Sequence, residues 1–149
     1  MKASAEFNKN LQAVLVDLIE LHLQGKQAHW VLVGPNFRDL HLQLDEIVDQ
    51  VRIFSDQIAE RMRALHGVPD GRTATVAETT SLDPLPEGEI STDDVVDLIA
   101  SRLEKVSGTL RDRHDQVDEE DPTTADIFHE IIAALEQQAW MVRAENRTL

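Results

Sequence analysis

Apolar side chains recur every three, four or seven positions along most of the chain, a spacing that places them on one face of a helix. The clearest such set is Val95, Ile99, Leu103, Val106, Leu110 and Val117. Strict alternation of apolar and polar residues, which is typical of strands, is absent from the sequence. The pattern predicts four long helices, over residues 5–33, 37–66, 91–119 and 122–146.

Residues that break helices are concentrated in a few places. Residues 34–36 separate the first two predicted helices, and residues 121–122 separate the last two. The 67–90 stretch carries several glycines and prolines and is too long for a hairpin loop. Residues 73–80 within it lack both, so we expect a short extra helix there. The chain is therefore predicted to be all-α, a ferritin-like four-helix bundle with a long middle crossover.

Three boundaries carry the chemistry of a helix N-cap, in which a side-chain oxygen accepts a hydrogen bond from the first turn. Asn36 is followed three residues later by Asp39, and Ser91 by Asp94. Asp121 precedes a proline, a residue favoured at the first position of a helix. The sequence predicts that all three residues cap helices.

The chain of 149 residues, 42% of them hydrophobic, is long enough for one core and has the usual size of a single domain. We therefore expect one domain over residues 1–149. The absence of cysteine excludes disulfides and thiolate metal sites. No apolar run is long enough for a signal peptide or a membrane span, so we expect a soluble cytoplasmic protein with no membrane partner.

Acidic residues outnumber basic ones by 28 to 14, which gives a net charge of −14. Such a chain attracts cations and repels nucleic acid phosphates. The ends offer few basic residues, namely Lys2, Lys9, Arg143 and Arg147. We therefore expect little DNA binding, although acidity also has the simpler explanation of solubility.

One series of histidine and acidic residues is symmetric; it consists of His29, His41, Asp45, Asp56 and Glu60. Its last four members lie symmetrically about a point between Gln50 and Val51, within one stripe of a helix. Asp45 and Asp56 would be about 16 Å apart along the axis, so one metal centre cannot use both. A second copy of this helix, antiparallel across the midpoint, would bring the histidine half of one chain to the carboxylate half of the other.

This symmetry predicts two metal sites per dimer, each shared between two chains. Imidazole and carboxylate together suit iron, zinc or manganese. The alternative is a solvated acidic face, because charged residues four positions apart are common on helices. The symmetric set, with His29 on the preceding helix, favours the metal site.

Several blocks of the sequence resemble, in order and spacing, the signature of the DNA-protection-during-starvation (Dps) family, or mini-ferritins. These blocks are AHW, GPNFRDLH, DEIVDQ, AERM, DPTTADIFHE and QQAWMVRAE. The resemblance covers nearly the whole chain. It implies a hollow homododecamer with a two-iron ferroxidase centre at each dimer interface. It also implies that Fe(II) is oxidised by hydrogen peroxide more readily than by oxygen and is stored as Fe(III) mineral.

The resemblance divides the predicted ligands between two subunits, with His29, His41 and Asp45 from one and Asp56 and Glu60 from the partner. Glu60 would be the bridging carboxylate. Ordinary ferritins instead build their two-iron site inside one bundle from Glu-x-x-His pairs, and this sequence contains none.

The residues next to these ligands have two interpretations each. Trp30 would point about 100° away from His29, as an electron donor beside the site or as an interface tryptophan. Arg61 would support Glu60, or be an ordinary surface charge. Packing is favoured for Trp140, which lies among apolar residues of the last predicted helix.

Other ionisable residues have simpler interpretations. His22 is predicted to be structural or to lie at an interface, and His66 and His114 have no partner at ligand spacing. The acidic residues predicted to be solvated or ion-paired are Asp17, Glu20, Glu46 and Asp49.

A second acidic group is predicted near the last helix break. Asp126 and Glu130 project from one helix face, and Asp121 lies at its N-terminus. In the family that the sequence resembles, the matching positions surround a three-fold pore, so rings of carboxylates would draw Fe(II) inward. The alternative is a helix cap with ordinary acids favoured by the helix dipole.

These observations predict an iron-storage ferroxidase with Fe(II) and hydrogen peroxide as substrates. Two irons can deliver two electrons to one peroxide, which yields water instead of a hydroxyl radical. Two alternatives stay open: a nucleoid-associated protection protein that binds DNA, and a structural cage without working metal sites.

Overall fold

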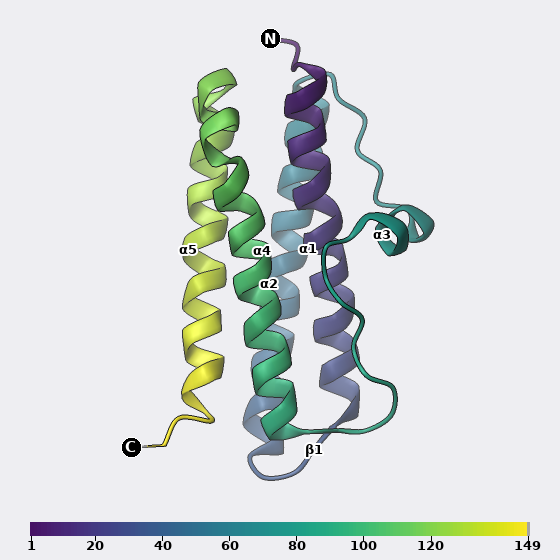
Figure 1. The fold of residues 1–149 in the computed structure, drawn as a ribbon, viewed down its shortest axis with the longest axis vertical. Coiled ribbons are helices and arrows are strands. Elements are labelled where there is room, and N and C mark those ends of the chain that lie inside the picture. Colours follow the sequence, from purple (N-terminus) through teal and green to yellow (C-terminus); the bar gives the residue numbers. More distant parts are fainter. Residues whose placement is uncertain (149) are drawn as a thin grey trace.

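The computed structural model describes residues 1–148, which form four long helices. They are α1 (Ala5–Val31), α2 (Phe37–Ala64), α4 (Thr92–Glu120) and α5 (Pro122–Ala144). α1 and α2 form one antiparallel pair and α4 and α5 another (Figure 1). Each helix begins and ends within two residues of its predicted position, so the predicted four-helix bundle is confirmed. In this part of the chain, no helix combines the length and apolar character needed to cross a membrane.

The connection from α2 to α4 runs along the outside of α1 (Figure 1). It contains the predicted short helix, α3 (Thr73–Thr79). Near its end, the strand β2 (Ile90–Ser91) pairs in parallel with β1 (Leu32–Val33), which follows α1. Two residues are too few to produce an alternating pattern, so these strands were not predicted. Their pairing ties the start of α4 to the loop between α1 and α2.

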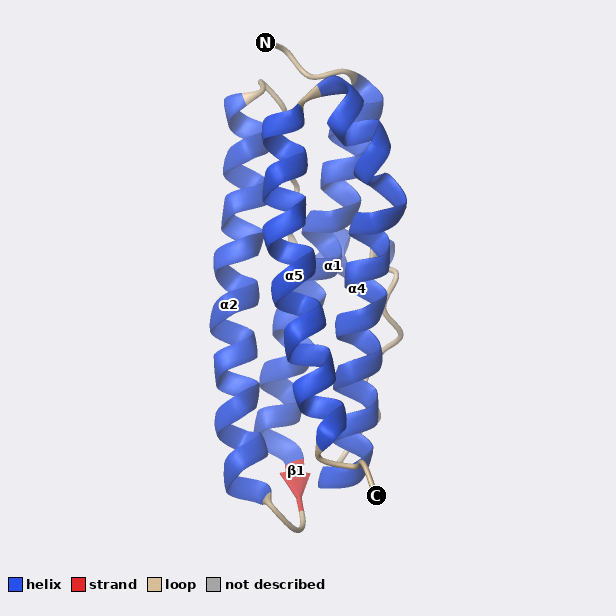
Figure 2. Cartoon of the chain, turned by 90° about the vertical axis from the view of Figure 1, so that its left-hand side faces the viewer, coloured by secondary structure: helices blue, strands red, loops and turns tan. Residues whose placement is uncertain are grey.

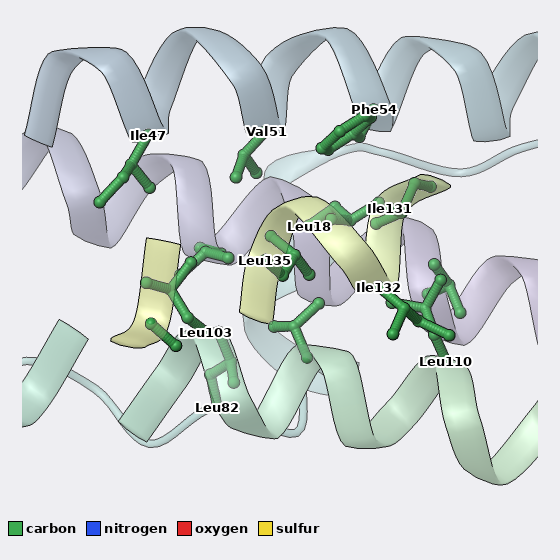
Figure 3. Packing of buried hydrophobic residues seen from close by; sticks show 14 of the residues in the cluster. Leu18, Ile47, Val51, Phe54, Leu82, Leu103, Leu110, Ile131, Ile132 and Leu135 are labelled. Atoms are coloured by element: carbon green, nitrogen blue, oxygen red, sulfur yellow. The ribbon is translucent and has the colours of Figure 1, made fainter. Parts of the chain in front are cut away.

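The hydrophobic core lies between the long helices, and all four contribute to it (Figure 3). Its fully buried residues include Leu18 of α1, Ile47 of α2, Leu103 and Leu110 of α4, and Leu135 of α5. Burying one such side chain contributes about 1.5–3 kcal/mol. Leu82 of the crossover packs onto the same cluster, so the crossover is part of the fold.

Asp17 of α1 holds the crossover through hydrogen bonds. Its side chain is 2% exposed and accepts hydrogen bonds from the Thr80 hydroxyl, from the backbone N–H and hydroxyl of Ser81, and from the Thr109 hydroxyl. The prediction that Asp17 is solvated or ion-paired is therefore wrong. A buried carboxylate requires such donors, and only the crossover and α4 bring them within reach.

Arg102 of α4 anchors the next part of the crossover. Its guanidinium donates to the backbone carbonyls of Asp83, at 3.0 Å, and Pro84, at 3.2 Å. It also donates to the side-chain oxygen of Gln24 on α1. These contacts fix the crossover against both helix pairs at the level where it turns toward α4.

The predicted N-caps have different outcomes. The Ser91 hydroxyl accepts from the Asp94 backbone N–H at 3.1 Å, so this cap is confirmed. Asn36 precedes α2 but is left-handed, with φ of 59°, and its amide donates to Glu145 instead of capping. Asp121 precedes α5 without a side-chain cap, because its carboxylate binds Arg61. In both wrong predictions, a residue distant in sequence competes for the side chain.

Candidate metal centre

The loop between α1 and α2 brings together the two histidines singled out in the sequence. His29 lies in the last turn of α1, and His41 lies near the start of α2. The loop is tight at Gly34, whose φ is 126° and where a Cβ would lie 3.0 Å from the Thr92 hydroxyl oxygen. Glycine suits this backbone because it has no Cβ to strain.

The two imidazole rings are stacked and hydrogen-bonded reciprocally. Their centroids are 3.6 Å apart and their planes differ by 17°. Nδ1 of His29 lies 2.7 Å from the carbonyl oxygen of His41, and Nδ1 of His41 lies 2.9 Å from the carbonyl oxygen of His29. A carbonyl oxygen only accepts, so each Nδ1 carries the proton and donates. In the neutral form of each ring the lone pair is then on Nε2, the atom that can bind a metal ion.

The surroundings restrict how these rings can move. His29 is 6% exposed, and Phe37 stacks on the His41 ring at a centroid distance of 5.0 Å. Phe37 was not among the predicted site residues, although it lies four positions before His41 on the same helix, a spacing that brings side chains together. The ligand-type nitrogens are thus held in place before any metal ion arrives.

Asp45 of α2 lies beside the histidine pair and is held by Lys26 of α1. One carboxylate oxygen of Asp45 accepts a hydrogen bond from the Lys26 ammonium and lies 3.4 Å from Nδ1 of His29. The hydrogen bond from Lys26 holds the pKa of Asp45 below its usual value. Lys26 was not among the predicted site residues, although it lies three positions before His29 on α1. Asp45 is thus ionised and could bind a metal cation, but its carboxylate is already paired with the Lys26 ammonium.

Asp56 and Glu60 are exposed and lie further along α2, which continues without a break from Phe37 to Ala64. The helical rise separates Asp45 and Asp56 by about 16 Å along the axis. Within residues 1–148, no three histidine or acidic side chains are grouped closely enough to hold a metal ion. One chain therefore presents the histidine and carboxylate halves as separate groups.

Asp56 borders a surface hollow of about 610 Å³ between α1 and α2. Leu15 and Ile19 of α1 contribute to its apolar lining. Ile53, one helical turn before Asp56, also lines the hollow and is 66% exposed. This side of α2 therefore offers apolar surface close to the midpoint of the symmetric series.

Arg61 points away from the predicted ligands and binds the start of α5. Its guanidinium donates to the Asp121 carboxylate at 2.5 Å and to the Thr124 hydroxyl at 3.0 Å. Burial opposes ionisation of Asp121, but the hydrogen bonds from Thr124 and Arg61 keep its pKa below the usual value. The negative charge of Asp121 is thus compensated inside the protomer, whereas Asp126 and Glu130 are exposed.

The similarity to known proteins extends over nearly the whole chain, well beyond this site. A family model described as a ferritin-like domain matches residues 8–149. A DNA protection during starvation protein from Agrobacterium fabrum is 37% identical over 135 residues, which cover 90% of this chain and 83% of the relative.

The chain belongs to the Dps family. A second relative, DNA protection during starvation protein 2 of Deinococcus radiodurans, is 32% identical over 90% of this chain. The chain spans 56% of the length of that relative.

Solved Dps structures have the same fold. The structure of Dps from Microbacterium arborescens in the high iron form has a TM-score of 0.89 at 32% identity, and the match covers 97% of each chain. DpsA14 from Streptomyces coelicolor has a TM-score of 0.92 at 31% identity, with 96% of this chain and 85% of that chain covered. The ferritin-like fold predicted from the sequence is confirmed by these matches.

The two tryptophans of this Dps-family chain are both on the surface. Trp30 is 67% exposed, and its role beside the histidines stays a prediction. Trp140 is 64% exposed and borders a hollow with Leu42 of α2, so the packing predicted for it does not occur in the core of this chain. Its apolar neighbours in sequence, Ala139 and Val142, are buried on another face of α5.

Proposed function

We propose that this chain is an iron-storing ferroxidase that binds Fe(II), oxidises it with hydrogen peroxide in preference to oxygen, and deposits Fe(III) mineral inside a hollow dodecamer. The observation that carries the proposal is the reciprocal hydrogen bonding of His29 and His41. It commits both Nδ1 atoms to carbonyl oxygens and leaves both Nε2 lone pairs for a metal ion. Membership of a ferritin-like family supports iron as that metal.

We propose further that each centre is shared by two antiparallel copies. His29, His41 and Asp45 come from one copy and face Asp56 and Glu60 of the other. The unbroken α2 helix supports this division, because its rise keeps the two halves apart within one chain. The exposed Ile53 beside Asp56 supports it too, since a second copy would cover this apolar surface.

The ligand types suit the reaction. Imidazole nitrogens bind Fe(II), and the carboxylates favour the more highly charged Fe(III) product. Two Fe(II) ions each give one electron to one hydrogen peroxide, which takes up two protons and becomes two water molecules. Because both electrons arrive together, the O–O bond breaks without releasing a hydroxyl radical. Glu60 would bridge the two ions, and Trp30 would give or accept a single electron if the paired transfer fails.

Mixed assemblies test the shared centre. His41→Ala and Glu60→Ala chains are each expected to lose fast peroxide-driven Fe(II) oxidation. Assembled together, they should recover part of it, because one of the two sites in each mixed dimer receives both intact halves. The recovery is measured by the rate of ferric absorbance after anaerobic Fe(II) loading and peroxide addition.

The control mixes His41→Ala with His29→Ala chains. Both substitutions lie in the same half of the site, so no intact site can form and no recovery is expected. Equal rates in the two mixtures would contradict a centre shared between chains. Full activity in each single variant would contradict the ligand assignment itself.

A further inference from the structure

A second pair of histidines lies on the other side of the bundle, between α4 and α5. The rings of His114 on α4 and His129 on α5 are stacked, with centroids 4.6 Å apart and planes 28° apart. They line a cavity of about 440 Å³ together with Asp115 and Glu136. α4 and α5 lie side by side over this region (Figure 2). The two histidines are distant in sequence, so no spacing pattern predicted their contact.

His114 carries an unused lone pair. Its Nδ1 lies 3.1 Å from a carboxylate oxygen of Asp115, which accepts, so Nδ1 carries the proton. In the neutral ring Nε2 is then an acceptor, and it is buried with no hydrogen-bond partner among residues 1–148. Buried polar atoms nearly always have a partner, so an unpaired one points to a missing proton donor or a missing cation.

His129 also lies near a carboxylate. Its Nδ1 lies 3.7 Å from a carboxylate oxygen of Asp126, one turn earlier on α5, which is an ion-pair distance and too long for a hydrogen bond. The hydrogen-bonded carboxylate at Nδ1 of His114 is characteristic of metal-binding histidines, because it fixes the tautomer and makes Nε2 a stronger donor to the metal.

The cavity contains few competing cations. Among the described residues that line it, Arg111 is the one arginine or lysine, and its guanidinium is bound to Glu136 at 2.7 Å and 3.0 Å. Ser107 also donates to Glu136, so this carboxylate is fully engaged. The charges of Asp115 and Asp126 remain available to attract a divalent ion.

We propose that Nε2 of His114 and Nε2 of His129 together bind one divalent transition-metal ion between α4 and α5. Imidazole ligands select zinc, copper, nickel or iron over magnesium and calcium. In the stacked arrangement the two Nε2 lone pairs lie in separate, nearly parallel planes, so binding of one ion requires the exposed His129 ring to turn toward Nε2 of His114. Water would fill the other coordination positions. The ion would join two helices of one chain, whereas the proposed ferroxidase centre joins two chains.

Zinc is the probe of choice because it has no redox chemistry. Binding is measured by calorimetric titration and by metal analysis after equilibrium dialysis, on the full chain in its assembled form. The His114→Gln and His129→Gln variants should each bind one fewer Zn²⁺ per chain than the parent. Asp115→Asn should keep the site but weaken it by about 10- to 100-fold.

His66→Gln is the matched control, because His66 is an exposed histidine just after α2 and stacks with no other histidine among residues 1–148. It should bind as much Zn²⁺ as the parent. None of these substitutions touches the predicted ferroxidase ligands, so failure of that centre would leave the difference between variants unchanged. Equal zinc stoichiometry and affinity in the parent, His114→Gln and His129→Gln would overturn the proposal. His129 is exposed, so its variant tests the site even if His114→Gln folds poorly.

Discussion

At the scale of single residues, hydrogen bonds to the backbone decide which atoms are available for chemistry. His29 and His41 each use Nδ1 on the other's carbonyl oxygen, which presents Nε2 of both rings. The carbonyl of His29 belongs to the last turn of α1, where no partner exists within the helix. The end of α1 therefore gains a hydrogen bond from the same contact that orients the His41 ring.

Lys26 is predicted to compete with the metal ion for Asp45. Replacing Lys26 with Met removes one positive charge, so divalent cations should bind roughly 30-fold more tightly at neutral pH, because a unit charge about 4 Å from a divalent ion contributes about 2 kcal/mol in water. The pKa of Asp45 should rise toward its ordinary value of 3.8 when the ammonium is absent. Asp45 then takes up a proton at higher pH in Lys26→Met than in the parent. The gain in cation affinity should therefore shrink as the pH falls toward about 4.

Anaerobic Mn(II) titration of the parent and Lys26→Met, at neutral pH and at about pH 4, measures the difference in cation affinity. Lys26→Arg is the control, because it keeps the charge and should keep the parent affinity. Weaker binding by Lys26→Met than by the parent at neutral pH would show that Lys26 supports the site and does not compete.

At the scale of the elements, the long crossover is held by polar contacts as much as by packing. Asp17 accepts from Thr80, Ser81 and Thr109, so one side chain joins α1, the crossover and α4. Leu82 follows this contact directly and packs on the core. The crossover therefore behaves as a part of the bundle that positions α4, with β2 leading into its first turn.

Asp17→Ala should lower the free energy of unfolding by about 3 kcal/mol, because it leaves several donors without their charged acceptor. Urea denaturation measures the loss, and limited proteolysis should show faster cleavage within residues 65–91. Asp112→Ala, at an exposed acid on α4, should change stability by less than about 0.5 kcal/mol. A similar loss of unfolding free energy in both variants would mean that the hydrogen bonds of Asp17 do not contribute more to stability than an exposed acid does.

At the scale of the whole molecule, charge controls which partners can approach. The net charge of −14 attracts cations over the surface as a whole. Asp126 and Glu130 are exposed near the start of α5, while Asp121 is bound to Arg61. If this region surrounds a pore of the assembled shell, the carboxylates of Asp126 and Glu130 are the ones free to attract Fe(II) into it.

The pore prediction concerns the rate of iron uptake. The double variant Asp126→Asn with Glu130→Gln should slow uptake by about tenfold at low ionic strength, where electrostatic steering is strongest. Stopped-flow measurement of mineral absorbance gives the rate, and size-exclusion chromatography checks that the shell is intact. Asp118→Asn, at an exposed acid on α4, is the control. Uptake at the parent rate in the double variant would remove the pore role.

Binding of duplex DNA is predicted to be undetectable for this chain at near-neutral pH and physiological salt. Affinity for the phosphate backbone comes from clustered cations, and acidic residues outnumber basic ones by 28 to 14 here. An electrophoretic mobility-shift assay without divalent ions measures it. A tight complex that weakens steeply with added salt would favour the alternative function of DNA protection by direct binding.

The sequence alone determined the four long helices and the short one, because helical periodicity and chain breakers act over a few neighbouring residues. It also determined the separation between Asp45 and Asp56, since a continuous helix converts sequence distance into length. Only the tertiary structure decided the partners of Asp17, Asn36, Asp121 and His114. Whether their hydrogen-bonding groups find a partner depends on elements that are distant in sequence. The proton positions on His29 and His41 depend in the same way on where α1 ends against α2, which no local pattern encodes.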